Sequence, residues 1–164
     1  MTSKNLQKSS AIQNNSVTLP SVSIALLFQT VLFRRTHVKK GGQFINLINK
    51  RAYVGQNTKL GKGCVIGNEV SISCDITIGD FVIIQRLVDI GHDAHIGDYC
   101  SFGNRSFMGG GACIGDNTMV HTGAIILPHV RVGKNCTVGA GAVVIKKVKD
   151  GDSVFGNPTK VLKF

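Results

Sequence analysis

The hydrophobic and polar positions of this sequence repeat every six residues from Ala52 to Lys147. Divided from Ala52 onward, the chain gives sixteen hexads without a gap: AYVGQN, TKLGKG, CVIGNE, VSISCD, ITIGDF, VIIQRL, VDIGHD, AHIGDY, CSFGNR, SFMGGG, ACIGDN, TMVHTG, AIILPH, VRVGKN, CTVGAG and AVVIKK. The third position is Val, Leu, Ile, Phe or Met in all sixteen, and the first is always Ala, Ser, Thr, Cys, Val or Ile. Glycine occupies the fourth position in eleven. A repeat of this length predicts one repetitive domain.

Each hexad predicts one short strand and one corner. Positions one and three of a strand point to the same side, so they form the buried face, while position two points outward. Glycine at position four supplies the backbone freedom for the turn. Three such strands close a triangular coil of about eighteen residues, and stacked coils pair through their backbones. We therefore expect an all-β solenoid, a parallel β-helix over residues 52–147, between a basic arm and junction (1–51) and a C-terminal tail (148–164).

The excess positive charge is concentrated at the front of the chain. The formal net charge is +10, yet residues 1–68 hold ten of the 19 Lys and Arg residues and none of the nine acidic residues. This basic arm, which includes His37, is either a solvated tail or a surface for the phosphates of a cofactor, a nucleotide-linked substrate, nucleic acid or a membrane. No aromatic stacking platform accompanies the charge, which disfavours nucleic acid. The apolar run at 22–33 is too short to span a bilayer, and it has no signal-peptide flanks.

The five cysteines form no CxxC motif. Cys64, Cys100 and Cys136 are 36 residues apart each time, which is two coils, so we expect them in one interior column. We predict small buried thiols in a reducing cytoplasm rather than a disulfide set.

His92 is the strongest candidate for chemistry. Adding eighteen residues to His92 and Asp93 gives Gly110 and Gly111, so a glycine rung, residues 109–111, lies directly over the His–Asp pair. Paired strands are about 4.8 Å apart, so these glycines leave an open pocket beside the imidazole. Histidine can act as a general base near neutral pH, Asp93 can hold its tautomer, and the Gly110 N–H can stabilise an oxyanion. The alternative is a corner histidine that only hydrogen-bonds to its own turn.

The hexads TIGDF, HIGDY and CIGDN and the closing VGAGAVV…VFGNPTKVLKF resemble the left-handed β-helix acyltransferases of the hexapeptide-repeat superfamily. This resemblance implies a left-handed coil, a homotrimer and acetyl-CoA in the groove between neighbouring subunits. From Phe33 to the end, FRRTHVKKGGQFINLINKRAYVG and GHDAHIGDY are most similar to the sialic-acid O-acetyltransferase type and to relatives that N-acetylate UDP-linked 4-amino-6-deoxy sugars. A short N-terminal α/β remnant, a helix–strand junction, should then precede the β-helix.

The resemblance also implies roles by position. His92 corresponds to the base, Asp93 to the acid that raises its basicity, and Gly110 to the backbone contact with the acetyl oxygen. The implied cofactor contacts are Ser101, Gly110, Thr122, Ala140, Lys146 and Pro158. Lys146, Lys147 and Lys160 either meet CoA phosphates or belong to a solvated basic end. Ser101 stands where some relatives carry a second histidine, so acetyl positioning would rest on backbone or hydroxyl groups.

The remaining histidines have weaker patterns. His95 is at an outward second position and fits a surface residue. His121 and His129 could face the groove or be surface residues. A zinc site of the related trimeric carbonic anhydrase type needs two histidines in one column two coils apart, and Pro128 and Arg131 occupy the corresponding positions here. No metal is therefore expected.

The sequence patterns and what the resemblance implies together predict a cytoplasmic, trimeric acetyltransferase. It would move acetyl from acetyl-CoA to an amine or hydroxyl of a nucleotide-linked sugar in bacterial glycan synthesis. Attack would be direct, because Cys74, the thiol in the His92 column, is expected to be structural. The relatives begin with a βαβ domain whose glycine-rich turn holds the nucleotide-sugar, whereas residues 1–32 contain no glycine. The acceptor handle is therefore missing or replaced, which leaves two rivals open: a non-sugar acceptor, or a scaffold without activity.

Overall fold

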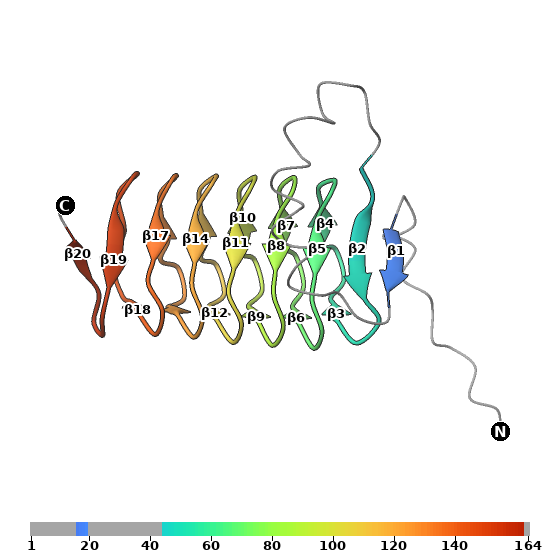
Figure 1. Cartoon of the computed structure of the whole chain (residues 1–164), viewed down its shortest axis with the longest axis horizontal. Helices are drawn as coiled ribbons and strands as arrows, with labels where there is room; N and C mark the ends of the chain where they lie inside the picture. The colour runs from blue at the N-terminus through green and yellow to red at the C-terminus, as the bar shows by residue number, and fades with distance from the viewer. Residues whose placement is uncertain (1–15, 20–43, 163–164) are drawn as a thin grey trace.

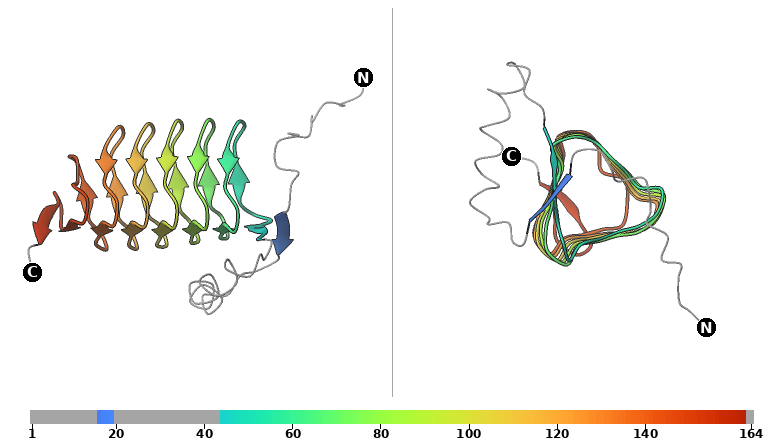
Figure 2. Two further views of the ribbon diagram at one scale, coloured as in Figure 1. Left: turned by 90° about the horizontal axis from the view of Figure 1, so that it is seen from above. Right: turned by 90° about the vertical axis from the view of Figure 1, so that its right-hand side faces the viewer.

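The computed structural model describes residues 16–19 and 44–162. In these ranges the chain winds into a parallel β-helix of about six turns. The coils lie side by side along one axis (Figure 1), and viewed along that axis they superpose as a triangle (Figure 2). The all-β solenoid expected from the hexads is confirmed. Within the described ranges, no helix is long and apolar enough to cross a membrane.

Three sheets form the sides of the triangle. Sheet A contains β1 (Ser16–Leu19), β2 (Asn46–Asn49), β5 (Val65–Ile66), β8 (Ile83–Ile84), β11 (Ser101–Phe102), β14 (Met119–Val120), β17 (Thr137–Val138), β19 (Ser153–Phe155) and β20 (Lys160–Leu162). Sheet B contains β3 (Tyr53–Val54), β6 (Ser71–Ile72), β9 (Asp89–Ile90), β12 (Phe107–Met108), β15 (Ile125–Ile126) and β18 (Val143–Val144). Sheet C contains β4 (Lys59–Leu60), β7 (Thr77–Ile78), β10 (His95–Ile96), β13 (Cys113–Ile114) and β16 (Arg131–Val132).

The coils pair in the expected eighteen-residue register. Asp89 of β9 pairs with Phe107 of β12, and His95 of β10 pairs with Cys113 of β13. At the C-terminal end the step shortens, since Thr137 of β17 pairs with Ser153 of β19. The strand β20 then runs antiparallel to β19, whereas the other pairings are parallel.

The interior consists of the first and third positions of the hexads. First positions are buried from Thr58 to Ala142, and third positions from Ile66 to Val144. Most of these side chains are aliphatic, so removal of apolar surface from water is the main force that holds the coils together. Second positions point outward as expected, although Val65 and Ile83 on sheet A are also buried.

The cysteine column is confirmed. Cys64, Cys100 and Cys136 are at most 1% exposed and form no disulfide. The Cys100 thiol donates to the Gly115 carbonyl at 3.2 Å, one coil further on. Burial raises the pKa of Cys100 to about 11. These thiols are therefore core side chains, and Thr118 takes the same place in the column between two of them.

The physical reason given above for glycine at position four is wrong. Among the non-glycine residues, it is the sixth position that adopts left-handed backbone angles, with φ from 53° to 61°. The fourth-position glycines are required instead by close approach of the next coil. A Cβ on Gly55 would lie 2.5 Å from the Ser73 carbonyl oxygen, and a Cβ on Gly91 would lie 2.5 Å from the Gly110 nitrogen.

The N-terminal region is described only in part. The strand β1 pairs in parallel with β2, with Ser16 opposite Asn46, and β2 in turn pairs with β5 of the first full coil. The basic arm with His37 and the helical part of the expected α/β remnant lie outside the described residues. Phe44 leads into the β-helix and packs edge-on against Phe81, with ring centroids 4.9 Å apart.

Candidate active site at the His92 corner

His92 lies at the corner between sheets B and C. We call this the His92 corner; its rungs are residues 55–57, 73–75, 91–93, 109–111, 127–129 and 145–147. The ring is 61% exposed because the fifth position of a hexad points outward. Its Nδ1 lies 2.8 Å from Oδ2 of Asp93, whose left-handed φ of 55° turns the carboxylate back toward the ring. A proton held on Nδ1 by this carboxylate leaves the Nε2 lone pair free to accept another proton.

The glycine rung lies one coil above, as the sequence predicts. The Gly111 N–H donates to the His92 carbonyl at 2.8 Å, which fixes the register between the two rungs. A Cβ added to Gly110 would lie 2.8 Å from His92 Nε2 and 3.0 Å from Cε1. The imidazole itself therefore leans into the space that glycine leaves, and the Nε2 atom faces the Gly110 backbone.

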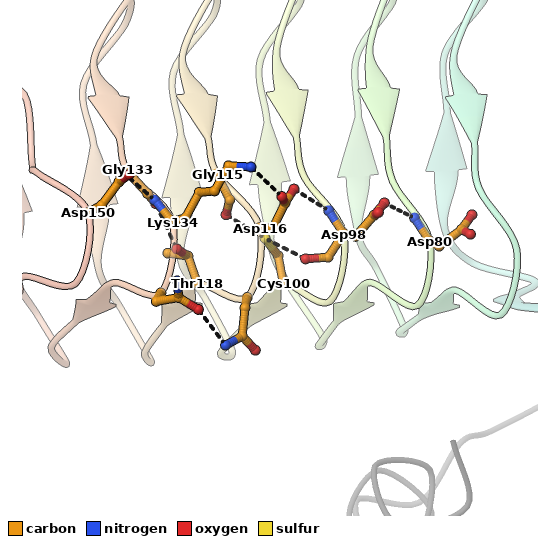
Figure 3. Close-up of polar contacts among 11 residues, drawn as sticks. Asp80, Asp98, Cys100, Gly115, Asp116, Thr118, Gly133, Lys134 and Asp150 are labelled. Atoms are coloured by element: carbon orange, nitrogen blue, oxygen red, sulfur yellow. Dashed lines mark hydrogen bonds and ion pairs between the residues drawn. The ribbon is translucent and has the colours of Figure 1, made fainter. Parts of the chain in front are cut away.

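At the corner after sheet C, several fifth-position N–H groups have a carboxylate acceptor. Those of Lys62, Asp80, Asp98 and Lys134 each donate to an aspartate one coil further on. Figure 3 shows the part of this column from Asp80 to Asp116. The Asp80 N–H donates to Asp98 at 2.7 Å, and the Asp98 N–H donates to Asp116 at 3.1 Å. Lys134 pairs with Asp116 at 2.9 Å, and this bond, more than the Asp98 amide, lowers the pKa of Asp116. These carboxylates cap the corner.

The Gly110 N–H lacks such a cap. The residue one coil above it is Pro128, whose side chain contains no hydrogen-bond acceptor. Among the described residues, no acceptor pairs with the Gly110 N–H. A backbone donor without a partner among the described residues, on the residue that the free nitrogen of an imidazole faces, is what a developing oxyanion requires.

His129 is a further side chain at the glycine rung. A Cβ on Gly111 would collide with His129 Nδ1, so this imidazole occupies the space above Gly111. The His129 N–H also donates to the Gly110 carbonyl at 3.0 Å. The sequence left this histidine between groove and surface, although the eighteen-residue step from Gly111 to His129 is a signal that could have placed it.

A second carboxylate lies one coil below Asp93. Asp75 accepts a hydrogen bond from the Asn57 amide at 3.0 Å. That bond lowers the pKa of Asp75, with smaller effects from the Cys74 thiol and from the positive charge of protonated His92. Sequence analysis did not single out Asp75. Two carboxylates therefore lie near His92, that of Asp93 on the same rung and that of Asp75 one coil below.

The predicted cofactor residues lie at two corners, on one sheet face and in the turn before β20. Lys146 is at the His92 corner, two coils beyond Gly110, and is exposed. Thr122 and Ala140 are exposed in consecutive coils at the corner after sheet A, and Ser101 points outward from sheet A. Pro158 is exposed in the turn before β20. A single chain thus does not bring the whole predicted set together.

The other histidines that the structure describes do not join His92 in a metal site. His95 points outward from β10 and is exposed, as expected for a surface residue, and His121 is exposed at the corner after sheet A. Over residues 16–19 and 44–162, no group of three or more His, Cys, Asp or Glu side chains could hold a metal ion.

Comparisons with known proteins agree with this geometry. Family models match at residues 112–146 ("Bacterial transferase hexapeptide (six repeats)") and at residues 93–128 ("Hexapeptide repeat of succinyl-transferase"). No curated protein sequence gives a significant match. Many solved structures, in contrast, match this chain significantly.

PerB from Caulobacter crescentus, solved in complex with CoA and GDP-perosamine, is 29% identical with a TM-score of 0.80, over 91% of this chain and 70% of that chain. WeeI from Acinetobacter baumannii AYE is 26% identical with a TM-score of 0.76, over 93% of this chain and 74% of that chain. The acetyltransferase domain of PglB from Neisseria gonorrhoeae, in complex with acetyl coenzyme A, is 28% identical with a TM-score of 0.75, over 80% of this chain and 66% of that chain. Together with the sixteen hexads and the coil geometry, these similarities support a β-helix acyltransferase of the hexapeptide-repeat type, similar to sugar acetyltransferases.

Proposed function

We propose that the chain transfers acetyl from acetyl-CoA to an amine or hydroxyl group of a nucleotide-linked sugar, with His92 as the general base. One observation carries this proposal. His92, with Nδ1 held by Asp93, presents its Nε2 to the residue whose backbone N–H has no partner among the described residues. The relatives supply the substrate class, since PerB was solved with CoA and GDP-perosamine and the PglB domain with acetyl coenzyme A.

The chemistry needs only groups at this corner. The acceptor nitrogen or oxygen attacks the thioester carbonyl carbon, and His92 Nε2 accepts the proton that the acceptor loses. Negative charge moves onto the carbonyl oxygen, where the Gly110 N–H donates a hydrogen bond. The C–S bond then breaks and releases CoA. Cys74 stays in the column below His92, and no covalent acetyl-enzyme is required.

The distribution of the cofactor residues supports a groove between two copies of the chain. Corner residues Thr122 and Ala140 would come from one subunit, and the His92 corner with Lys146 from its neighbour. Sheet B carries exposed apolar side chains at Tyr53 and Phe107, which are 64% and 40% exposed. A face of this kind is typical of a protein interface, and we propose a homotrimer built on it.

The cellular context follows from the same proposal. Nucleotide-linked sugars are made in the cytoplasm, and free thiols such as Cys74 and Cys113 persist in a reducing compartment. We therefore place the protein in the cytoplasm, in the synthesis of bacterial polysaccharides or other glycans.

The test is release of CoA from acetyl-CoA, measured with a panel of acceptors. GDP-perosamine and UDP-linked 4-amino-6-deoxy sugars should be acetylated. His92→Ala should lower kcat/KM by about 10²-fold or more, because a positioned general base contributes about 10² to 10⁴ in rate. Its thermal unfolding should stay unchanged, since His92 is exposed.

Two other results would replace the proposal. Acetylation of amino acids or antibiotic amines, with no activity on sugars, would establish the non-sugar acceptor. A wild-type protein that never consumes acetyl-CoA would establish a scaffold. Sedimentation of the purified protein tests the trimer separately.

A further inference from the structure

The glycine rung is covered by imidazoles on both sides. His92 lies on its N-terminal side and reaches toward Gly110, while His129 lies on its C-terminal side and reaches toward Gly111. In the sixth-position column of this corner, Asn57 donates a hydrogen bond to Asp75 of the next coil at 3.0 Å. Glycine at 111 has no side chain for such a contact. It leaves room for the His129 ring, whose Nδ1 would meet a Cβ at that position.

A backbone hydrogen bond links His129 to Gly110, the residue whose N–H would stabilise the oxyanion. The Gly110 carbonyl accepts the His129 N–H at 3.0 Å, while the Gly110 N–H remains without an acceptor among the described residues. His129 is exposed, like His92, so both rings can meet a molecule bound at this corner. Coils are about 4.8 Å apart, so the two histidine rungs lie roughly 10 Å apart, on either side of the glycine rung. A thioester bound beside Gly110 would therefore have one histidine rung on each side.

The charge of the corner gives the bound thioester a direction. Asp75 and Asp93 lie on the N-terminal side of the glycine rung, whereas Lys146 and Lys147 lie one coil beyond His129. The phosphates of CoA would therefore lie toward the lysines. The chain of atoms that leads from those phosphates to the acetyl group must pass the rung of His129 before it reaches Gly110. The sulfur atom comes next to His129, on the side opposite to the base.

We propose that His129 is a second catalytic residue, which donates a proton to the departing thiolate of CoA. This inference rests on the proposed acetyl transfer. As the C–S bond breaks, its electron pair goes to sulfur, and the imidazolium of His129 supplies the proton that makes the neutral thiol. His92 retains the proton taken from the acceptor. The two rings then exchange protons with water, so the net reaction converts acetyl-CoA and acceptor to CoA and acetylated product without another reactant.

Two substitutions test this role without disturbing the corner. Asn occupies the sixth position with left-handed φ at Asn57, Asn117 and Asn135, and Gly does so at Gly63 and Gly123. His129→Asn and His129→Gly should both therefore fold, and the second keeps the test valid if the first does not. The control is His95→Thr, because His95 points outward from sheet C and Thr77 occupies the same column one coil below.

The readout is the dependence on the leaving group. With acetyl-CoA, both His129 variants should lose about 10²-fold in kcat with KM for acetyl-CoA unchanged, the lower end of general acid catalysis. With S-(4-nitrophenyl) thioacetate as acetyl donor, whose thiolate leaves without a proton, variant and wild-type rates should agree. Added imidazole should restore His129→Gly with acetyl-CoA, and His95→Thr should match the wild type throughout.

Three outcomes overturn the inference. These are full activity of the His129 variants, an equal loss with both donors, and a change confined to KM. His92→Ala separates this inference from the proposed function, because it should lose activity with either donor. If wild-type protein releases no CoA, the proposed function fails; if only the His129 results differ from expectation, the second role alone fails.

Discussion

Gly110→Ala should impair catalysis while leaving the fold intact. The new Cβ would lie 2.8 Å from His92 Nε2, 3.0 Å from Cε1 and 3.1 Å from Cδ2, whereas ordinary contact begins at 3.4 Å. The imidazole must therefore move by about 0.6 Å or rotate, which pulls Nδ1 away from Asp93. Since a misplacement of about 1 Å can cost about 10²-fold, we expect kcat/KM to fall by about 10-fold to 10²-fold, equivalent to roughly 1.4 to 2.7 kcal/mol.

The free energy of unfolding, in contrast, should be little changed by Gly110→Ala. Gly110 does not have a left-handed φ, so alanine is compatible with its backbone. The substitution reduces the freedom of the unfolded chain, worth about 0.4 to 1 kcal/mol, which offsets the cost of moving an exposed ring. The free energy of unfolding in urea should therefore stay within about 1 kcal/mol of the wild type.

The assay is CoA release followed with a thiol-reactive chromophore, combined with a double-mutant cycle. In a His92→Ala background the Cβ has no ring to displace, so Gly110→Ala should cause little further loss. Asn104→Ala, at the fifth position of another corner of the same coil, controls for general effects of a corner substitution. Unchanged kcat/KM in Gly110→Ala, or the same fold loss with and without His92, would refute the argument from ring displacement.

Other parts of the structure give further predictions. Ile96→Ala should lower the free energy of unfolding in urea by about 2 to 5 kcal/mol, because Ile96 is fully buried. Asp116→Asn should destabilise the protein at pH 7 but not near pH 2. The pKa of Asp116 is lower in the folded protein than its unfolded value of 3.8, so the ionised carboxylate contributes stability above pH 3.8 that is lost as the pH falls through the folded pKa. Urea midpoints at both pH values check this. Cys100 should resist a thiol reagent at pH 8 until the protein is denatured, since its pKa is raised to about 11; mass spectrometry of the labelled protein measures it. Phe107→Lys should shift the sedimenting species toward monomer, and an unchanged trimer would show that sheet B is not the interface.

Most of the architecture could be predicted from the six-residue period. The period fixes which side chains face inward and which residues stack, so the placement of Gly110 over His92 followed by counting. The reason for the fourth-position glycines could not be found in this way, because close approach between coils depends on how the corner bends. Left-handed φ at the sixth position was likewise hidden, since Phe81 and Leu87 adopt it despite their bulk.

The site was harder to predict than the fold. Side-chain direction decides whether a corner histidine turns toward the axis of the stack or away from it, and the sequence does not contain this information directly. His129 was therefore left undecided. The missing acceptor for the Gly110 N–H became visible only by comparison with Asp80 and Asp98, whose N–H groups are capped at another corner.

The antiparallel strand β20 covers part of one end of the β-helix. The last coil of a solenoid has unpaired backbone N–H and C=O groups, as each earlier coil would have without the next one. Another molecule could pair with these groups, and repeated pairing would give a fibre. By folding back along β19, residues 160–162 reverse the direction of the chain and pair with these groups on one of three sides. Removal of these residues should turn a discrete assembly into one that elongates with concentration.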